Sequence, residues 1–290
     1  MHPLYQKGLR VMLKKQLFLV LAGVAAILMM YFAGKTVQNK KTIPEVAKAI
    51  KQFDIEHFTD SVTALLPDNQ QASLKTLTTN IPTDSVQKST RFLKIADFWR
   101  DSAHHTEPYL YYISAASKLE NSEKSLNFAA RLMLDHLRMH NDEVAAEWMT
   151  REAADLFNRA IEKNPHDDDL RIGLGSTYIY GSGRMGNSAD AMKGIQEILV
   201  VASKDSSNMK AQLVLGVGGM VSGQYDKARD RFLNVIKHEP NNIEAIAYLA
   251  DTYAVLGEKE EAIKWYNKSK ILVNDPHYSK EVDERINRLK

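Results

Sequence analysis

The string in this 290-residue chain that most suggests chemistry is GSGRMG, at residues 181–186. It matches the pattern G-x-G-x-x-G, in which closely approaching backbone amides bind the pyrophosphate of a dinucleotide. That chemistry requires the string to lie between a β-strand and an α-helix. The residues before it have helical spacing, so we interpret the string as an enlarged loop between two helices. An enzyme that uses this loop remains an alternative hypothesis.

Two histidines offer a second candidate chemistry. His136 and His140 lie four residues apart on one predicted helix, which is a spacing that can bind a metal ion. No glutamate accompanies them in an HExxH arrangement and no third ligand is evident, so we interpret them as surface or packed side chains. The absence of cysteine excludes disulfides, thiolate metal sites and cysteine nucleophiles. We therefore predict no catalytic residue, no cofactor and no metal site, and a protein that is not an enzyme.

Residues 168–276 contain three copies of one sequence repeat. The last two copies begin MKAQLVLGVGGMVSGQYDKA and IEAIAYLADTYAVLGEKEEA. Equivalent leucines, glycines and aromatic residues are separated by 34 residues: Leu215 and Leu249, Gly223 and Gly257, Phe232 and Tyr266. The first copy has a longer turn, because Leu174 precedes Leu215 by 41 residues. A period of this length is typical of two antiparallel helices per repeat.

These repeats resemble the tetratricopeptide repeat superfamily. The resemblance implies an all-α fold, a TPR-like α-solenoid of antiparallel helix pairs. Small residues such as Gly216 and Ala250 would let the two helices of a pair approach closely. Gly223 and Gly257 would end the first helix in the left-handed conformation that suits glycine. We predict that residues 84–167 form degenerate helix pairs of the same kind and that residues 277–290 form a capping helix.

In this superfamily the first helix of each pair builds most of the inner, concave side. The resemblance places these residues in a predicted protein-binding groove: Ile172, Ile179, Tyr180, Leu213, Val214, Val217, Met220, Val221 and Tyr248. They are mostly apolar and differ from the Lys, Asn and Arg of the clamps that bind acidic C-terminal tails. Two interpretations stay open. Either a partner's hydrophobic or amphipathic segment enters the groove, or the protein's own N-terminal helices fold back into it.

The N-terminal region begins with a basic tail at residues 1–16. Residues 17–34, LFLVLAGVAAILMMYFAG, are uncharged and near the minimum length of a membrane-spanning helix. We predict a single uncleaved transmembrane anchor there, in preference to a buried core helix or a cleaved signal peptide. Residues 35–83 read as a polar stalk with short helices. Positive charge is balanced on the two sides of the run, so a periplasmic and a cytosolic C-terminal domain both remain open, and we favour the periplasmic one.

The whole layout resembles membrane-anchored envelope tetratricopeptide proteins of bacteria. The strings EKSLNF (residues 123–128) and NMKAQLVLGVGGMVSGQYDKA (residues 208–228) resemble Bacteroidetes-type members. The resemblance implies a single-pass protein of the bacterial inner membrane, a scaffold or chaperone-like adaptor for envelope or Sec-translocon-associated proteins. The alternative is a cytosol-facing scaffold that regulates a membrane complex. A net charge of +2 gives no reason to expect a nucleic-acid partner.

Overall fold

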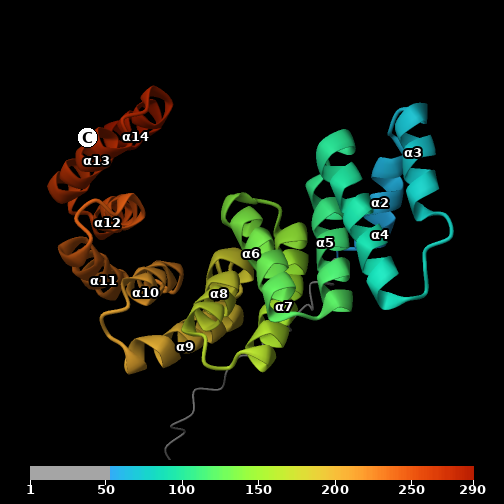
Figure 1. Cartoon of the computed structure of the whole chain (residues 1–290). Helices are drawn as coiled ribbons and strands as arrows, with labels where there is room; N and C mark the ends of the chain where they lie inside the picture. Colours follow the sequence, from blue (N-terminus) through green and yellow to red (C-terminus); the bar gives the residue numbers. More distant parts are fainter. Residues whose placement is uncertain (1–52) are drawn as a thin grey trace, which may run out of the picture. The chain divides into compact units, whose positions relative to one another are not determined.

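The structure, a computed structural model, describes residues 53–290, and this part of the chain contains helices and no strand (Figure 1). The all-α prediction is therefore confirmed; the predicted anchor at residues 17–34 lies outside the described residues. The α-helices are α2 (Ile55–Ala64), α3 (Asp68–Thr78), α4 (Ser85–Phe98), α5 (Thr106–Glu120), α6 (Glu123–Met139), α7 (Glu143–Lys163), α8 (Asp168–Tyr178), α9 (Ser188–Lys204), α10 (Met209–Val221), α11 (Tyr225–His238), α12 (Ile243–Leu256), α13 (Lys259–Val273) and α14 (Pro276–Leu289).

Local sequence explains where the repeat helices begin and end. Asn208 and Asn242 directly precede α10 and α12. Each side chain accepts a hydrogen bond from a backbone N–H of the first helical turn, because that N–H has no acceptor within its own helix. At the other ends of these helices, Gly223 and Gly257 have φ angles of 74° and 78°. The left-handed glycines predicted just after the first helix of each pair are therefore confirmed.

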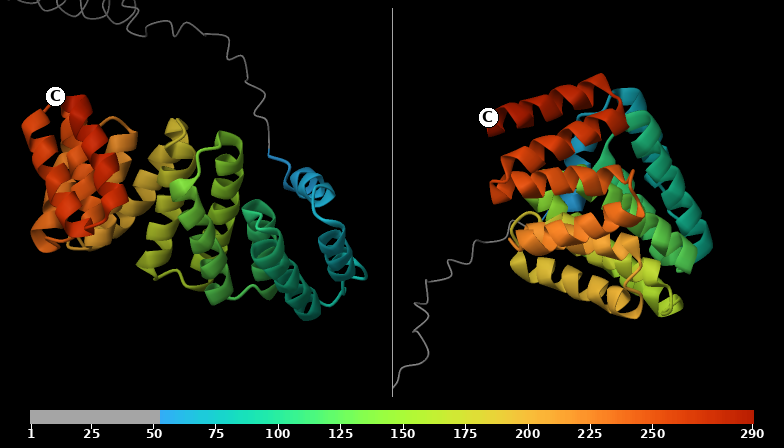
Figure 2. Two further views of the ribbon diagram at one scale, coloured as in Figure 1. Left: turned by 90° about the horizontal axis from the view of Figure 1, so that it is seen from above. Right: turned by 90° about the vertical axis from the view of Figure 1, so that its left-hand side faces the viewer.

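The helices pair in chain order as hairpins: α4 with α5, α6 with α7, α8 with α9, α10 with α11, and α12 with α13. Each hairpin packs against the next, and α14 covers α13 at the C-terminal end (Figures 1 and 2). We call the first helix of a hairpin its A helix and the second its B helix. This order is the predicted solenoid of antiparallel helix pairs.

Close packing within a hairpin depends on the small residues of the repeat. A Cβ atom added at Gly216, on the A helix α10, would lie 2.4 Å from the ring of Phe232 on the B helix α11. Phe232 is completely buried, and its ring stacks on that of Tyr248 in the next hairpin at a centroid distance of 5.7 Å. The glycine thus makes room for an aromatic ring that joins two successive repeats.

The first described residues add a further layer to the N-terminal end. The short helices α2 and α3 pack against α5 and α4, and they bury Val62, Leu66 and Leu74. Phe53 contacts the next hairpin as well, because the centroid of its ring lies 5.5 Å from that of Trp148 in α7. This part of the segment expected to be a stalk is thus packed on the helical hairpins.

Within the described residues, two A helices end in a π-helical turn that sequence periodicity did not indicate. Trp99–Ala103 follows α4, and Ile179–Gly183 follows α8. A π-turn widens the helix by one residue per turn and changes the direction of the side chains that it carries. The second turn positions Tyr180, which is central to the site described next.

Candidate functional site

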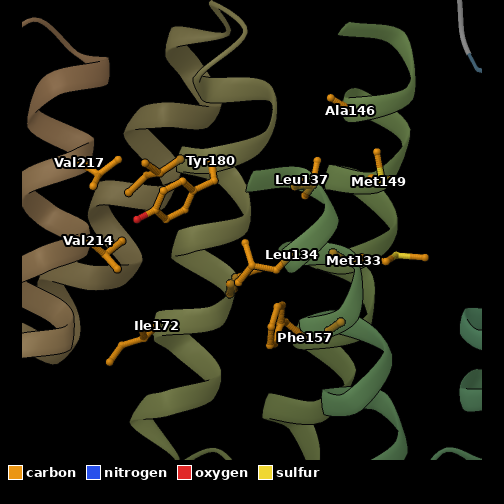
Figure 3. Packing of buried hydrophobic residues seen from close by; sticks show 14 of the residues in the cluster. Met133, Leu134, Leu137, Ala146, Met149, Phe157, Ile172, Tyr180, Val214 and Val217 are labelled. Carbon is orange, nitrogen blue, oxygen red and sulfur yellow. The ribbon is translucent and has the colours of Figure 1, made fainter. Parts of the chain in front are cut away.

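The nine predicted groove residues lie on α8, the π-turn after it, α10 and α12. Met220, Val221 and Tyr248 are partly exposed and the other six are buried. In Figure 3, Tyr180 lies between α10, which carries Val214 and Val217, and α6, which carries Leu134 and Leu137. Six of the nine predicted residues are therefore covered by the chain itself, and α6 packs against α8 and the π-turn, which carry three of them.

A pocket of about 290 Å³ remains open on the A-helix side. We call it the inner pocket. Its lining comes from α6, α8, α10 and the first turn of α12. Its apolar and small residues are Leu134, Ile172, Gly173, Ser176, Leu213 and Val214, and its charged residues are Arg131, Asp135, Arg138, Lys210 and Glu244. Three of the predicted groove residues, Ile172, Leu213 and Val214, thus line an open cavity.

Four successive A helices supply this lining in one register. On α6 the lining residues are Arg131, Leu134, Asp135 and Arg138, with the i, i+3, i+4, i+7 spacing of one helix face. These α6 residues are not among the predicted groove residues. Their spacing equals that of inward-facing positions in the recognised repeats, so extending the repeat frame to α6 would have found them.

Ion pairs neutralise part of the charge in the inner pocket. Lys210 lies 2.6 Å from Asp169, and this ammonium group lowers the pKa of the Asp169 carboxyl below its ordinary value. Arg131 instead donates through Nε to the Asn127 side chain at 2.9 Å. Within residues 53–290, Arg131 makes no ion pair with a carboxylate, although its charge helps to lower the pKa of the Asp169 carboxyl.

Tyr180 joins three A-helix hairpins through one buried ring. The Arg138 guanidinium lies 4.3 Å from the ring centroid, and the Tyr180 hydroxyl donates a hydrogen bond to Glu244 at 3.0 Å. Arg138 also contacts the same Glu244 oxygen at 3.1 Å. Burial, and then the neighbouring Tyr248 and Glu244, raise the pKa of Tyr180 well above its ordinary value of 10. The hydroxyl therefore stays protonated and remains a donor.

The glycine-rich string is a packed loop between α8 and α9. It follows a helix, as predicted, and no strand lies among residues 53–290. The Ser182 backbone N–H donates to the Thr150 hydroxyl at 3.0 Å, and a Cβ at Gly181 would lie 2.1 Å from that oxygen. Arg184 donates to the carbonyls of Leu137 and His140 at the end of α6. The amide and side chains of this loop hold two hairpins together.

The two histidines lie near the end of α6. Partial burial lowers the pKa of His136 below its ordinary value of 6.5. Among the described residues, no group of three or more His, Asp or Glu side chains is arranged to hold a metal ion. In the same part of the chain, every helix is too short or too polar to cross a lipid bilayer.

A second cavity of about 510 Å³ lies at the N-terminal end, between α2, α3 and the α4–α5 hairpin. Asp60, Lys75, Trp99 and Tyr112 contribute to its lining, together with threonine and glutamine side chains. Trp99 is fully buried, and its indole N–H has no acceptor within the described residues. The sequence does not indicate this cavity, because α2 and α3 carry no repeat pattern.

A stack of helical hairpins with a pocket on the A-helix side defines a helical-repeat protein. The family model described as Tetratricopeptide repeat matches residues 221–280. The structure of TTC0263, a TPR protein of Thermus thermophilus, is 14% identical, with a TM-score of 0.51 over 69% of this chain and 98% of that one. Residues 221–280 thus match a tetratricopeptide repeat, and the described part of the chain has the TPR-like helical fold that its repeat pattern predicted.

Two further structures show weaker similarity. PilW, a type IV pilus biogenesis factor, is 14% identical, with a TM-score of 0.46 over 69% of this chain and 92% of that one. YrrB, described as a TPR protein with an unusual peptide-binding site, is 17% identical, with a TM-score of 0.41 over 68% of this chain and 92% of that one. A comparison with curated proteins found none whose sequence matches this chain.

Proposed function

We propose that this protein is a non-enzymatic scaffold that binds a segment of a partner protein in the inner pocket. The tetratricopeptide fold supports the general class, since helical-repeat solenoids present extended surfaces for protein interaction. The observation that carries the proposal is the composition of the pocket. Four successive A helices place an apolar floor beneath a charged rim, and such a surface suits an amphipathic segment.

The size of the inner pocket favours a peptide over a cofactor. Its volume of about 290 Å³ is at the lower limit of small-molecule sites, which span roughly 300–1,000 Å³. It is large enough for one or two apolar side chains that project from a longer segment. Leu213 and Val214 would then contact those side chains, while Lys210 on the exposed rim contacts polar groups beside them.

The self-occupied alternative is supported in part by the packing of α6. α6 packs against α8 and the π-turn, the part of the predicted surface that carries Ile172, Ile179 and Tyr180. We propose that α6 forms one wall of the binding site and that the partner enters between this wall and α10.

We further propose that residues 17–34 anchor the scaffold in a bacterial inner membrane, with the C-terminal domain in the periplasm. The support is the uncharged 18-residue run in the sequence. Envelope or Sec-translocon-associated proteins are then the proposed partners, and the Bacteroidetes-type likeness stays a prediction. Alkaline phosphatase fused after Lys290 is active only if the C-terminus lies outside the cytoplasm. An inactive phosphatase fusion, together with a fluorescent green fluorescent protein fusion at the same position, would favour the cytosol-facing alternative.

Site-specific crosslinking tests the binding proposal. A photoreactive amino acid replaces Lys210, which is exposed on the rim of the inner pocket, or Lys227, which is exposed on the B helix α11. We expect a discrete protein adduct from position 210 in intact cells and none of the same mass from position 227. Equal adducts at both positions, or none at 210, would contradict the proposal.

A further inference from the structure

The Glu244 carboxylate binds to two donors, Arg138 and Tyr180, that belong to other helical hairpins. Glu244 lies in the first turn of α12, yet one of its carboxylate oxygens accepts hydrogen bonds from Arg138 at 3.1 Å and from the Tyr180 hydroxyl at 3.0 Å. Arg138 belongs to α6 and Tyr180 to the turn after α8. The carboxylate therefore reaches from the α12 hairpin across to two hairpins that precede it by more than one repeat.

The donors of this site are held in place without Glu244. Tyr180 is only 3% exposed, so the packing around its ring fixes the position of its hydroxyl oxygen. The Arg138 guanidinium lies against the Tyr180 ring at 4.3 Å, a cation–π contact that orients the charged group. A fixed hydroxyl donor beside an oriented guanidinium is a ready-made binding site for a carboxylate.

The contact made by Glu244 uses this site incompletely. Only one guanidinium nitrogen of Arg138 pairs with the carboxylate, although the planar group can bind both oxygens of a carboxylate at once. Both side chains of the pair are 36% exposed, and solvent-exposed ion pairs contribute little to stability. A carboxylate that approaches from the solvent can therefore replace Glu244 at little cost.

The charges around the inner pocket favour such a replacement. Lys210 is paired with Asp169, so the remaining charges of the rim are Arg131, Arg138, Asp135 and Glu244. When the Glu244 carboxylate turns away from Arg138, the nearest charged side chains of the lining are Arg131, Arg138 and Asp135. Two guanidinium groups near one carboxylate favour an incoming carboxylate.

We propose that Glu244 is an internal occupant of a carboxylate-binding site, and that the partner segment carries an acidic side chain next to a leucine-like one. The partner's carboxylate displaces Glu244 from Arg138 and Tyr180, while its apolar neighbour enters the inner pocket. This inference rests on the proposed function, since it names the chemistry of the segment that binds there. The competing interpretation is that the three residues only fasten α6 to α12.

Fluorescence anisotropy on the full chain in mild detergent tests the inference. The probes are a fluorescein-labelled nonapeptide of alternating leucine and aspartate, and a counterpart with asparagine in place of aspartate. We expect Glu244→Gln to bind the aspartate peptide about ten times more tightly than the native chain, because the competing carboxylate is gone. The asparagine peptide should gain no affinity, and adding Arg138→Gln or Tyr180→Phe to Glu244→Gln should reverse the gain.

Four results would overturn the inference. They are an unchanged Kd for Glu244→Gln, an equal gain for the asparagine peptide, a gain that survives the loss of Arg138, and failure of the aspartate peptide to bind any variant. Thermal melting of each variant by circular dichroism verifies that the helices remain folded. If a partner is still crosslinked at position 210 while these results appear, the proposed function stands and only the carboxylate chemistry is wrong.

Discussion

The contact between α8 and α9 gives the sharpest test of how the repeats pack. Gly175 on α8 and Gly194 on α9 face each other across the hairpin. A Cβ atom at Gly194 would lie 2.6 Å from the Gly175 carbonyl oxygen and 2.7 Å from a side-chain carbon of Ile179. In the reverse direction, a Cβ at Gly175 would lie 2.8 Å from the Gly194 carbonyl oxygen. The two contacts with carbonyl oxygens are against backbone, which cannot rotate away as a side chain can.

The magnitude for Gly194→Ala follows from two opposing effects. Alanine in a helix interior is favoured over glycine by about 1 kcal/mol. Overpacking a buried contact costs about 1–3 kcal/mol, and the backbone obstacle places this site at the upper end. We therefore expect a loss of about 1–2 kcal/mol in the free energy of unfolding. For a folded unit of this size, that corresponds to a melting temperature lower by about 2–8 °C.

Thermal and urea unfolding followed by circular dichroism measure this change. Gly219→Ala is the matched control, because its Cβ would lie 3.2 Å from the Ala228 side chain and 3.3 Å from the nearest backbone atoms, compared with 2.6 Å at Gly194. There the helical preference of alanine offsets a mild contact, so the control should melt near the native temperature. If Gly194→Ala were as stable as the native chain, close backbone approach would not be the reason for glycine in this hairpin.

Two further predictions concern single side chains. Asn242→Ala removes the acceptor for the Ala245 N–H at the start of α12, and we expect a loss of about 1 kcal/mol in unfolding experiments, with Asn242→Asp as a near-neutral control. His136 has a folded-state pKa below 6.5, so the unfolded chain binds a proton more readily and stability falls as the pH drops below 6.5. We expect His136→Gln to flatten that decline in urea unfolding between about pH 7 and pH 5, and an unchanged slope would contradict it.

The repeat pattern predicted the parts of the fold that local sequence determines. Helix pairing, the asymmetry between the first and later turns, and the left-handed Gly223 and Gly257 all follow from residue types at fixed spacing. These features depend on backbone conformation and on contacts inside one hairpin. A period of about 34 residues therefore carries most of the information needed to place them.

The inner pocket was predicted only in part, because one of its walls lacks the repeat pattern. Where α8, α10 and α12 have Gly175, Gly216 and Ala250, the matching position of α6 is Leu137, a fully buried residue. Because a large side chain stands at this position, the repeat pattern of small residues is not recognisable in α6. The arginines of α6 were consequently missed, and the groove seemed more apolar than it is. The predicted groove residues, which differ from those of the clamps for acidic C-terminal tails, did not include Arg131 and Arg138.

The π-turn that positions Tyr180 depends on tertiary contacts. Its backbone is held by the Thr150 hydroxyl from α7, and Arg184 fixes the following loop to the end of α6. Neither contact leaves a periodic trace in the sequence. The glycine-rich string indicated a loop at this position but not its structural role, because the same pattern occurs in phosphate-binding loops and, in this protein, at the junction of two hairpins.

Amide hydrogen exchange of the full chain, with and without the partner identified by crosslinking, shows whether the A-helix side around the inner pocket is the docking surface. We predict slower exchange on binding in α6, α8, α10 and the start of α12, with the B helices α9 and α11 unchanged. Slower exchange confined to α9 and α11 would contradict the account.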